Sequence, residues 1–226
     1  MTKLTHTSRS IAGQLELYDE RAKSLDLIWC KQVLNLMQAD NCIDHTQKLK
    51  INDIGCNYFQ FYKEIKKNKL ENAFDYFGYD IDQDFIDIGL KYFPNLHNKY
   101  DVLNIEEILP RATEVSIISA TLEHAENPYK LLANVLSTTS KKIILRTFIG
   151  NHEIIKLLDD PKFVQTPYYV NQFSLFKVAN IFLENGFAPK LIQDIATNKS
   201  HEYELLAGSD IFRQMYILVG EKLANV

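Results

Sequence analysis

Glycine, cysteine and positive charge are scarce in this 226-residue sequence. It has 8 glycines and 3 cysteines, and its net charge is −4. Cys30, Cys42 and Cys56 are odd in number and show no Cys-x-x-Cys spacing, which indicates thiols in a reducing compartment and argues against a structural zinc site. The acidic balance provides no positive field for a phosphate backbone, so we expect no nucleic-acid partner.

Long hydrophobic runs are also absent. The first ten residues, MTKLTHTSRS, lack the apolar run of a signal peptide, and no apolar stretch approaches the roughly 20 residues that span a bilayer. We therefore expect a cytoplasmic protein without a membrane partner. Hydrophobic residues make up 46% of the chain, which is enough for a substantial core. One domain over residues 1–226 is predicted, as a monomer or a homodimer.

Strand and helix signals alternate along the chain. An amphipathic helix is predicted from about residue 14 to 38, and Asn127-Pro128 marks the start of another helix, with Asn127 as its cap. The less regular stretch 151–167 predicts a short helix and a loop. Short apolar runs predict strands at 49–54, 73–79, 99–103, 115–120, 142–147, 187–195 and 215–220, and further helices are predicted at 59–65, 84–92 and 173–185.

This alternation predicts an α/β fold, a three-layer, doubly wound, Rossmann-like sheet with helices on both faces. The sheet is expected to be mostly parallel with an antiparallel C-terminal strand. Ligands of such folds bind outside the carboxyl ends of the strands. The candidate site residues are therefore those that follow each strand.

Three segments that follow strands, in this order and spacing, resemble the class I S-adenosylmethionine-dependent methyltransferases, of the small-molecule type with a Leu-Glu-His element. They are DIGCN at 53–57, GYDID at 78–82 and ATLEHAENP at 120–128. The resemblance covers roughly residues 48–148. It implies an N-terminal helix or lid over about 1–45, and an acceptor-side insertion with C-terminal strands over about 149–226.

The first of these segments departs from the family's pattern, which is an acidic residue, any residue and then Gly-x-Gly-x-Gly. Asp53 and Gly55 fit that pattern, but Asn57 and Phe59 replace the second and third glycines. Asn tolerates a left-handed backbone, so the turn can survive at Asn57. Phe59 is expected to lie inside the following helix with ordinary backbone angles.

The resemblance implies S-adenosylmethionine as the cofactor. Asp80, after the second strand, would accept both ribose hydroxyls, with Asp82 as the nearby alternative. Asp101 would lie near the adenine amine, although Asn104 could take that place. The cofactor-binding residues so implied are Tyr18, Asp53, Gly55, Cys56, Asn57, Asp80, Ile81, Asp101, Ser119 and Thr121. Tyr18 also belongs to the apolar stripe of its helix, so packing is its alternative role.

Two histidines are the candidate catalytic residues. His124 and His152 could each act as a general base, or His124 could brace its loop and His152 lie on the surface. Arg146 could clamp an anionic group of the acceptor. A polar and aromatic substrate-binding wall is predicted from Tyr168, Tyr169 and Asn171.

The predicted reaction is methyl transfer to a small molecule, more often at oxygen than at nitrogen, with a saccharide or nucleotide sugar as a possible acceptor. The sequence requires no metal. Two alternatives stay open: a non-catalytic S-adenosylmethionine- or nucleotide-binding protein on the same fold, and a nicotinamide-dependent oxidoreductase. The second is disfavoured because no strand is followed by Gly-x-Gly-x-x-Gly.

Overall fold

The computed structural model describes residues 14–24, 26–39, 47–160, 167–197, 204–206 and 208–224. Cys42 and much of the predicted lid segment lie outside these residues. Within them, nine strands form one sheet. The strands are β1 (Leu49–Ile54), β2 (Phe74–Asp80), β3 (Tyr100–Val102), β4 (Thr113–Ser119), β5 (Thr139–Gly150), β6 (Ile154–Leu158), β7 (Tyr168–Ser174), β8 (Phe187–Gln193) and β9 (Met215–Lys222).

The order and direction of the strands confirm the predicted doubly wound sheet. Pairing runs β3-β2-β1-β4-β5 with every neighbour parallel, and β9 then lies antiparallel between β5 and β8. The expected antiparallel C-terminal strand is therefore β9. The hairpin β6–β7 branches from the end of β5, where Ile149 and Gly150 pair with the end of β7.

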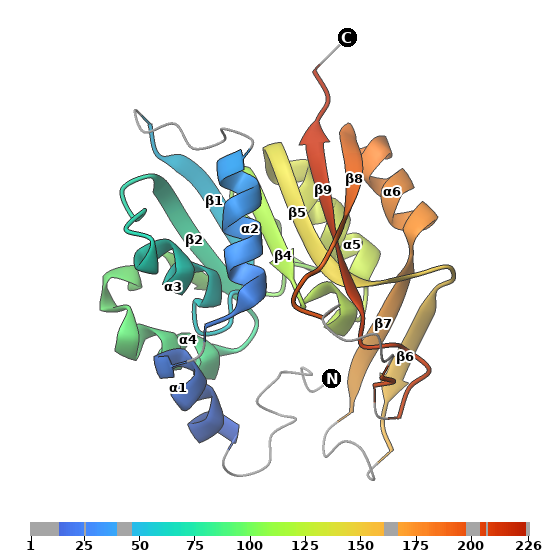
Figure 1. Ribbon diagram of the computed structural model, residues 1–226, viewed down its shortest axis with the longest axis horizontal. Coiled ribbons are helices and arrows are strands. Elements are labelled where there is room, and N and C mark those ends of the chain that lie inside the picture. The colour runs from blue at the N-terminus through green and yellow to red at the C-terminus, as the bar shows by residue number, and fades with distance from the viewer. Residues whose placement is uncertain are drawn as a thin grey trace.

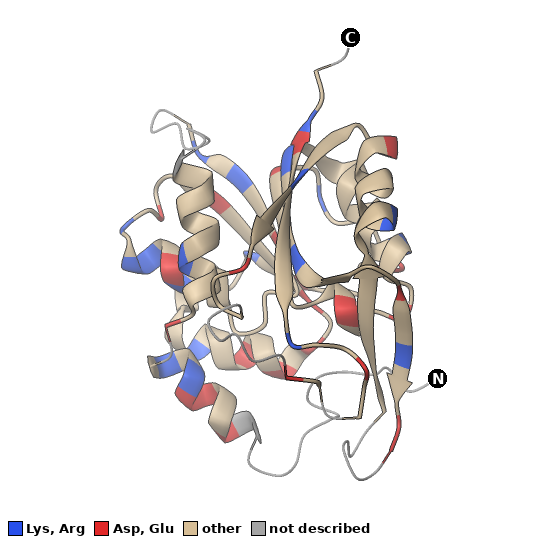
Figure 2. Cartoon of the chain, turned by 45° about the vertical axis from the view of Figure 1, so that its right-hand side comes forward, with Lys and Arg blue, Asp and Glu red and all other residues tan. Residues whose placement is uncertain are grey.

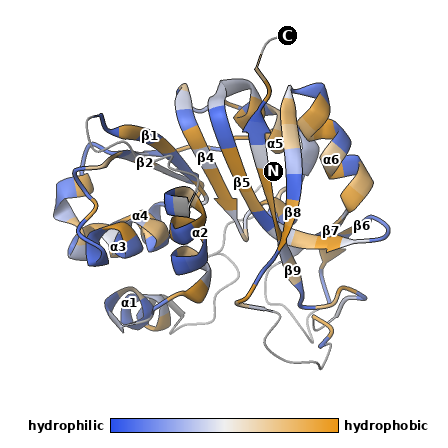
Figure 3. Ribbon diagram, turned by 45° about the horizontal axis from the view of Figure 1, so that its top comes forward, coloured by the Kyte–Doolittle hydropathy of each residue, from blue (hydrophilic) through white to orange (hydrophobic). Residues whose placement is uncertain are grey.

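Helices cover both faces of this sheet, with α2 in front of it and α5 behind it in Figure 1. The helices are α1 (Gln14–Ser24), α2 (Ile28–Ala39), α3 (Gln60–Lys67), α4 (Gln83–Tyr92), α5 (Pro128–Thr138) and α6 (Leu175–Glu184), with 3-10 turns η2 (Pro94–Leu96) and η3 (Leu122–His124). Two buried clusters result, one under α2, α3 and α4 and one under α5 and α6. Figure 3 shows the corresponding hydrophobic residues along β4 and β5.

The predicted single helix from 14 to 38 is wrong, because two helices occupy this stretch. They separate because they pack on different surfaces. In α1, Asp19 binds Tyr92 and Lys91 of α4 at 2.9 and 3.1 Å, whereas α2 buries Trp29 and Val33 against the sheet.

The predicted short helix within 151–167 is also wrong. Residues 154–158 form strand β6, and 161–166 lie outside the described residues. The sequence IIKLL is rich in branched aliphatic side chains that suit a pleated strand. Strand β6 pairs with β7, a segment for which the sequence predicted pocket-lining residues but no strand. The helix predicted from Phe173 begins at Leu175, as α6.

Phe59 is buried in the core rather than placed on an ordinary helical turn. Its ring lies among Tyr76, Tyr100, Gly78 and Gly89. A Cβ added to Gly89 would lie 2.5 Å from the ring, and one added to Gly78 would lie 3.2 Å from it. The two glycines thus leave the space that the aromatic ring fills between β2 and α4.

No helix within the described ranges is long and apolar enough to cross a membrane. In the same ranges no group of three or more His, Cys, Asp or Glu side chains is placed to hold a metal ion. Cys30 and Cys56 are buried free thiols.

We predict that Gly89→Ala destabilises the protein by about 1–3 kcal/mol, because the new methyl group overpacks the Phe59 ring. In a Phe59→Leu background the same substitution should cost much less, since the ring edge is gone. Urea denaturation of the four proteins of this cycle measures the coupling. If helix propensity alone decided the outcome, Gly89→Ala would stabilise both backgrounds equally. That result would contradict the claim that the Phe59 ring fills the space beside Gly89.

Candidate functional site

The carboxyl ends of the parallel strands meet at one edge of the sheet, the lower edge in Figure 1. Helix α1 lies on one side of this edge and the hairpin β6–β7 on the other. Most residues that the sequence singled out lie along this edge. It is therefore the candidate site.

The segment after β1 is a turn of alternating left-handed residues. Gly55, Asn57 and Phe59 have φ values of 73°, 54° and 60°. These are the three positions that a Gly-x-Gly-x-Gly motif would occupy. The expectation of ordinary angles at Phe59 is wrong: it is the N-cap of α3 and fully left-handed. All three positions have the left-handed backbone that glycine adopts most readily, although two of them are not glycine.

Gly55 is the position of this turn where no side chain fits. A Cβ there would lie 2.0 Å from Oγ1 of Thr121, which itself is 3.2 Å from the Ile54 carbonyl oxygen and 3.1 Å from that of Ser119. Thr121 therefore joins the ends of β1 and β4 directly over Gly55. This close approach explains why the first glycine of the pattern is kept.

Asp80, at the end of β2, is held by the backbone of the same turn. Its Oδ2 accepts from the Asn57 N–H at 2.8 Å and its Oδ1 from the Asp82 N–H at 3.0 Å. Burial raises the pKa of Asp80 to about 6, so the carboxylate is mostly ionised at neutral pH. Since a carboxylate has about four lone-pair positions, Asp80 can still accept a hydrogen bond from a ligand in addition to those from the backbone.

Asp82, the alternative to Asp80, caps a helix instead. Its Oδ1 accepts from the Asp84 N–H at 3.1 Å, at the start of α4. That bond stabilises the first turn of the helix. Of the two carboxylates, Asp80 is the one that the turn after β1 contacts.

Asp53 lies beneath the turn, with 2% of its surface exposed. Its Oδ2 accepts from the Tyr76 hydroxyl at 2.7 Å. Burial raises the pKa of Asp53 to about 7, despite the opposing effect of that hydrogen bond. A carboxyl group in this state titrates close to neutrality.

The remaining predicted cofactor residues are more varied in position. Cys56 is buried against Gly78 and contributes its backbone N–H to the Tyr79 carbonyl oxygen. Ser119 is 8% exposed and its Oγ has no hydrogen-bond partner among the described residues. Ile81 is half-buried.

Tyr18 and Asp101 lie further out. Tyr18 packs edge-on against Phe85 of α4, with ring centroids 4.9 Å apart. Asp101 is exposed and lies within β3, not after it as the sequence suggested. Asn104, its alternative, accepts from the Glu106 N–H in a turn.

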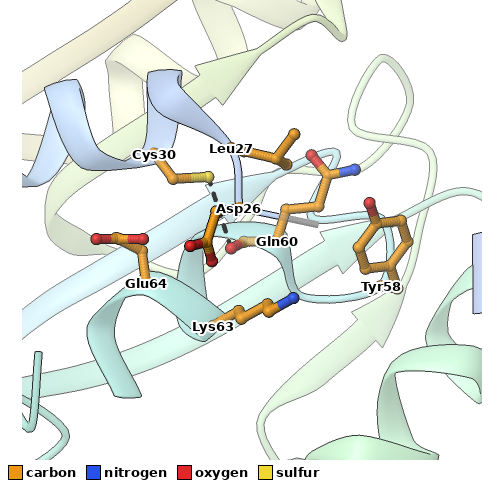
Figure 4. A pocket seen from close by; sticks show the side chains of 7 residues that line it. All are labelled: Asp26, Leu27, Cys30, Tyr58, Gln60, Lys63 and Glu64. Atoms are coloured by element: carbon orange, nitrogen blue, oxygen red, sulfur yellow. Dashed lines mark hydrogen bonds between the residues drawn. The ribbon is translucent and has the colours of Figure 1, made fainter. Parts of the chain in front are cut away.

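A pocket opens beside the turn, between the N-terminal ends of α2 and α3 (Figure 4). Lys63, Asp26 and Glu64 give it charges of both signs. Cys30 Sγ donates to the Gln60 carbonyl oxygen at 3.6 Å, and Lys63 Nζ donates to the Ala22 carbonyl oxygen at 3.1 Å. The pocket is lined by Asp26, Leu27, Cys30, Tyr58, Gln60, Lys63 and Glu64.

On the other side of the site, η3 is joined to the hairpin. His124 Nδ1 lies 2.9 Å from the Tyr169 carbonyl oxygen, and its ring meets Tyr168 edge-on at 5.8 Å. Asn171 is fully buried and donates to the Ala125 carbonyl oxygen at 2.9 Å. Its Oδ1 accepts from the Lys156 N–H, so both ends of the amide hold the hairpin in place.

Arg146 and His152 are not brought together with these residues. Arg146 is buried and pairs with Asp194 at 2.9 Å, with its guanidinium 5.8 Å from the centre of the Trp29 ring. His152 is exposed between β5 and β6, and its backbone oxygen accepts from Gln172.

The sequence reasoning missed the residues that line the pocket and the one that supports η3. Thr147 Oγ1 donates to Oε2 of the buried Glu123 at 2.9 Å, beneath His124. Tyr58 and Gln60 are the neighbours of Phe59 in the turn. The position of Phe59 in the resembled glycine pattern was therefore the signal that could have placed them in the site. Asp26 carried no such signal, because it depends on the break between α1 and α2.

Comparison with known proteins finds no family model and no curated protein that matches the sequence. Solved structures do match over nearly the whole chain. One is a magnesium protoporphyrin IX methyltransferase from Synechocystis PCC 6803 with bound S-adenosylmethionine, at 13% identity and TM-score 0.54, covering 98% of this chain and 86% of that one.

Two further matches have the same fold. The Burkholderia thailandensis 1,6-didemethyltoxoflavin-N1-methyltransferase is 10% identical with TM-score 0.56, covering 99% of this chain and 93% of that one. A methyltransferase from Clostridium acetobutylicum is 8% identical with TM-score 0.61, covering 94% and 99%. The chain therefore has the Rossmann-like fold of these methyltransferases.

We predict that the Asp53 carboxyl group makes stability depend on pH. Because its pKa is raised in the folded state, the stability it contributes is complete near pH 4 and is lost as pH rises through about 7. The loss is on the order of 4 kcal/mol. Asp53→Asn, which can still accept from Tyr76, should be more stable than the wild type at pH 8 and differ little at pH 4.5. Urea denaturation measures the free energy of unfolding of both proteins. The same difference between variant and wild type at pH 4.5 and at pH 8 would contradict the assignment.

Proposed function

We propose that this protein is an S-adenosylmethionine-dependent methyltransferase that acts on a small molecule. The observation that carries the proposal is the left-handed turn at Gly55, Asn57 and Phe59, which contacts the Asp80 carboxylate. In doubly wound folds a carboxylate at this strand end binds the ribose of a nucleotide ligand, and a tight turn after the first strand lets the ligand approach the backbone. The shared fold with solved methyltransferases supports the same assignment.

The residues along the strand ends fit this cofactor. Asp80 would accept the ribose hydroxyls, and the exposed Asp101 of the neighbouring strand would lie on the adenine side. Lys63 and the carboxylates of Asp26 and Glu64 carry charges of both signs, which suits the zwitterionic amino-acid end. When bound, the cofactor supplies a methyl group on a positively charged sulfur, which becomes a neutral thioether after transfer.

His124 is the proposed general base. A carbonyl oxygen only accepts hydrogen bonds, so the contact with Tyr169 requires the proton of a neutral ring on Nδ1. The lone pair is then on Nε2, where it can take a proton from an acceptor hydroxyl. This tautomer supports O-methylation over N-methylation, because a neutral amine needs no base. His152 is exposed and would be the weaker candidate.

A non-catalytic binding protein would use the same turn, and it would bind the cofactor without turnover. A nicotinamide-dependent enzyme would bind reduced nicotinamide cofactors tightly in a fluorescence titration. The sequence also suggested a saccharide or nucleotide-sugar acceptor, and the ring of Tyr168, which lies edge-on to His124, is compatible with stacking on a sugar ring.

We predict that Asp80→Ala weakens binding of S-adenosylhomocysteine by about 2–4 kcal/mol, through the loss of two charge-assisted hydrogen bonds. The same variant should lose as much affinity for 5′-methylthioadenosine, which has the ribose but no amino-acid end. Isothermal titration of a variant shown to be folded by circular dichroism provides the measurement. Unchanged affinity for both ligands would remove Asp80 from the site.

Lys63→Met should separate the two ligands. It is expected to lower the affinity for S-adenosylhomocysteine roughly tenfold, because one ion pair is lost, and to leave the affinity for 5′-methylthioadenosine unchanged. Lys31→Met, which removes an exposed lysine of α2, serves as the control. A parallel loss of both ligands in Lys63→Met would mean that the pocket does not hold the amino-acid end.

His124→Gln should lower kcat for a hydroxyl acceptor by roughly 10²–10⁴-fold, because the base is lost, while cofactor affinity stays the same. The wild-type rate should fall at low pH as the imidazole is protonated, and this fall should be absent in the variant. A variant that keeps the wild-type rate and pH profile would leave His124 with only its bracing contact to β7.

A further inference from the structure

Asp53 is a buried carboxyl group without a cationic partner. Its side chain makes one hydrogen bond, in which Oδ2 accepts from the Tyr76 hydroxyl at 2.7 Å. Among the residues that the structure describes, no lysine, arginine or histidine forms an ion pair with it. The carboxylate at this position therefore loses its hydration without gaining a counter-charge.

The groups that face Asp53 add no positive charge. They are the Tyr76 hydroxyl and the Asp80 carboxylate from β2, the Cys56 thiol of the turn and the Cys30 thiol of α2. Burial raises the pKa of the tyrosine and of both thiols, so these three groups stay protonated at neutral pH. Asp80 is the charged neighbour, and its charge is negative.

Charges further from Asp53 do not supply a counter-ion either. Figure 2 shows the strands mainly tan, with charged residues gathered on helices and loops. Glu64 of α3 and Arg146 of β5 both act on Cys30, and Arg146 is paired with Asp194 at 2.9 Å. Burial raises the pKa of Asp53 to about 7 against the opposing hydrogen bond from the tyrosine hydroxyl, and the Asp80 charge raises it further.

Asp53 also lies under both parts of the proposed cofactor contact. It precedes Gly55 of the turn by two residues, and its register partner Gly78 precedes Asp80 by two. Its charge acts on Cys30, which lines the pocket in Figure 4. In S-adenosylmethionine the sulfur lies between the ribose and the amino-acid end. With the ribose at Asp80 and the amino-acid end in the pocket, the sulfur would lie over this carboxyl group.

We propose that Asp53 distinguishes the methylated cofactor from its demethylated product by the charge on sulfur. The carboxylate attracts the sulfonium and has no such attraction for the neutral thioether, so binding of the sulfonium expels the proton of Asp53 to solvent. The proposal rests on the methyltransferase assignment and deepens it. An ionised Asp53 favours the cation, so the preference for the sulfonium grows as pH rises through about 7 and is lost at lower pH.

The test uses two probes that differ only at sulfur. They are 5′-methylthioadenosine, a neutral thioether, and its S-methyl sulfonium salt. Neither has an amino-acid end, so neither probe titrates between pH 5.5 and pH 8.5, and the ribose contact to Asp80 is common to both. Isothermal titration of the full chain should show the ratio of sulfonium to thioether affinity rising about fivefold to tenfold over this range.

The variants assign this rise to its group. Asp53→Asn should abolish it, and Tyr76→Phe, which removes the hydrogen bond to the ionised carboxylate, should move its midpoint to higher pH. Asp75→Asn serves as the control and should behave as the wild type. It removes another carboxylate of β2, one that is paired with Lys99 at 2.7 Å.

Proton release provides a second measurement that needs no variant. At pH 7 the sulfonium should release about half a proton per molecule bound and the thioether none, which the binding heats in phosphate and Tris buffers measure. Equal release by the two probes, a ratio that does not change with pH in the wild type, or a full rise retained in Asp53→Asn would each overturn the inference. Failure of S-adenosylhomocysteine to bind the folded chain would instead contradict the methyltransferase assignment.

Discussion

Burial of the Phe59 ring is the constraint on which the candidate site depends. A left-handed phenylalanine costs about 1–2 kcal/mol, whereas burying a phenylalanine side chain stabilises a protein by about 1.5–3 kcal/mol. Packing therefore offsets the strain, and it does so only because Gly78 and Gly89 leave space for the ring. In this chain the glycines that make the turn possible lie on β2 and α4 as well as in the turn itself.

This exchange explains how the left-handed turn, which we propose binds the cofactor, forms with Asn57 and Phe59 in place of glycines. Asn57 keeps the left-handed angle and donates its N–H to Asp80, and Gly55 keeps the close approach to Thr121. The turn and the carboxylate thus form one unit that spans the ends of β1 and β2. On the far side, His124 is held by the carbonyl of Tyr169, so the residues proposed to bind the cofactor and those proposed to bind the acceptor belong to separately braced halves of the same edge.

Most of the fold was predictable from local pattern, and the site only in part. The bounds of β1 were predicted to the residue, because a buried apolar run ended at a glycine turn. The split between α1 and α2 was not, since it depends on α1 packing against α4. The angle of Phe59 and the pairing of Arg146 with Asp194 were equally hidden, because each depends on contacts distant in sequence. The position of Asp80 at the end of β2 was predictable because the apolar run of the strand ends there, and its role in ribose binding stays a prediction.

The central claim is that a turn lacking two glycines still presents its backbone to a ribosyl cofactor. A titration of ¹⁵N-labelled protein with S-adenosylhomocysteine, followed through the backbone amide signals, tests it most directly. Saturable shifts at Gly55, Asn57, Phe59 and Asp82 are the predicted result. Amide signals in this turn that stay unchanged at millimolar ligand, in a folded chain, would contradict the account.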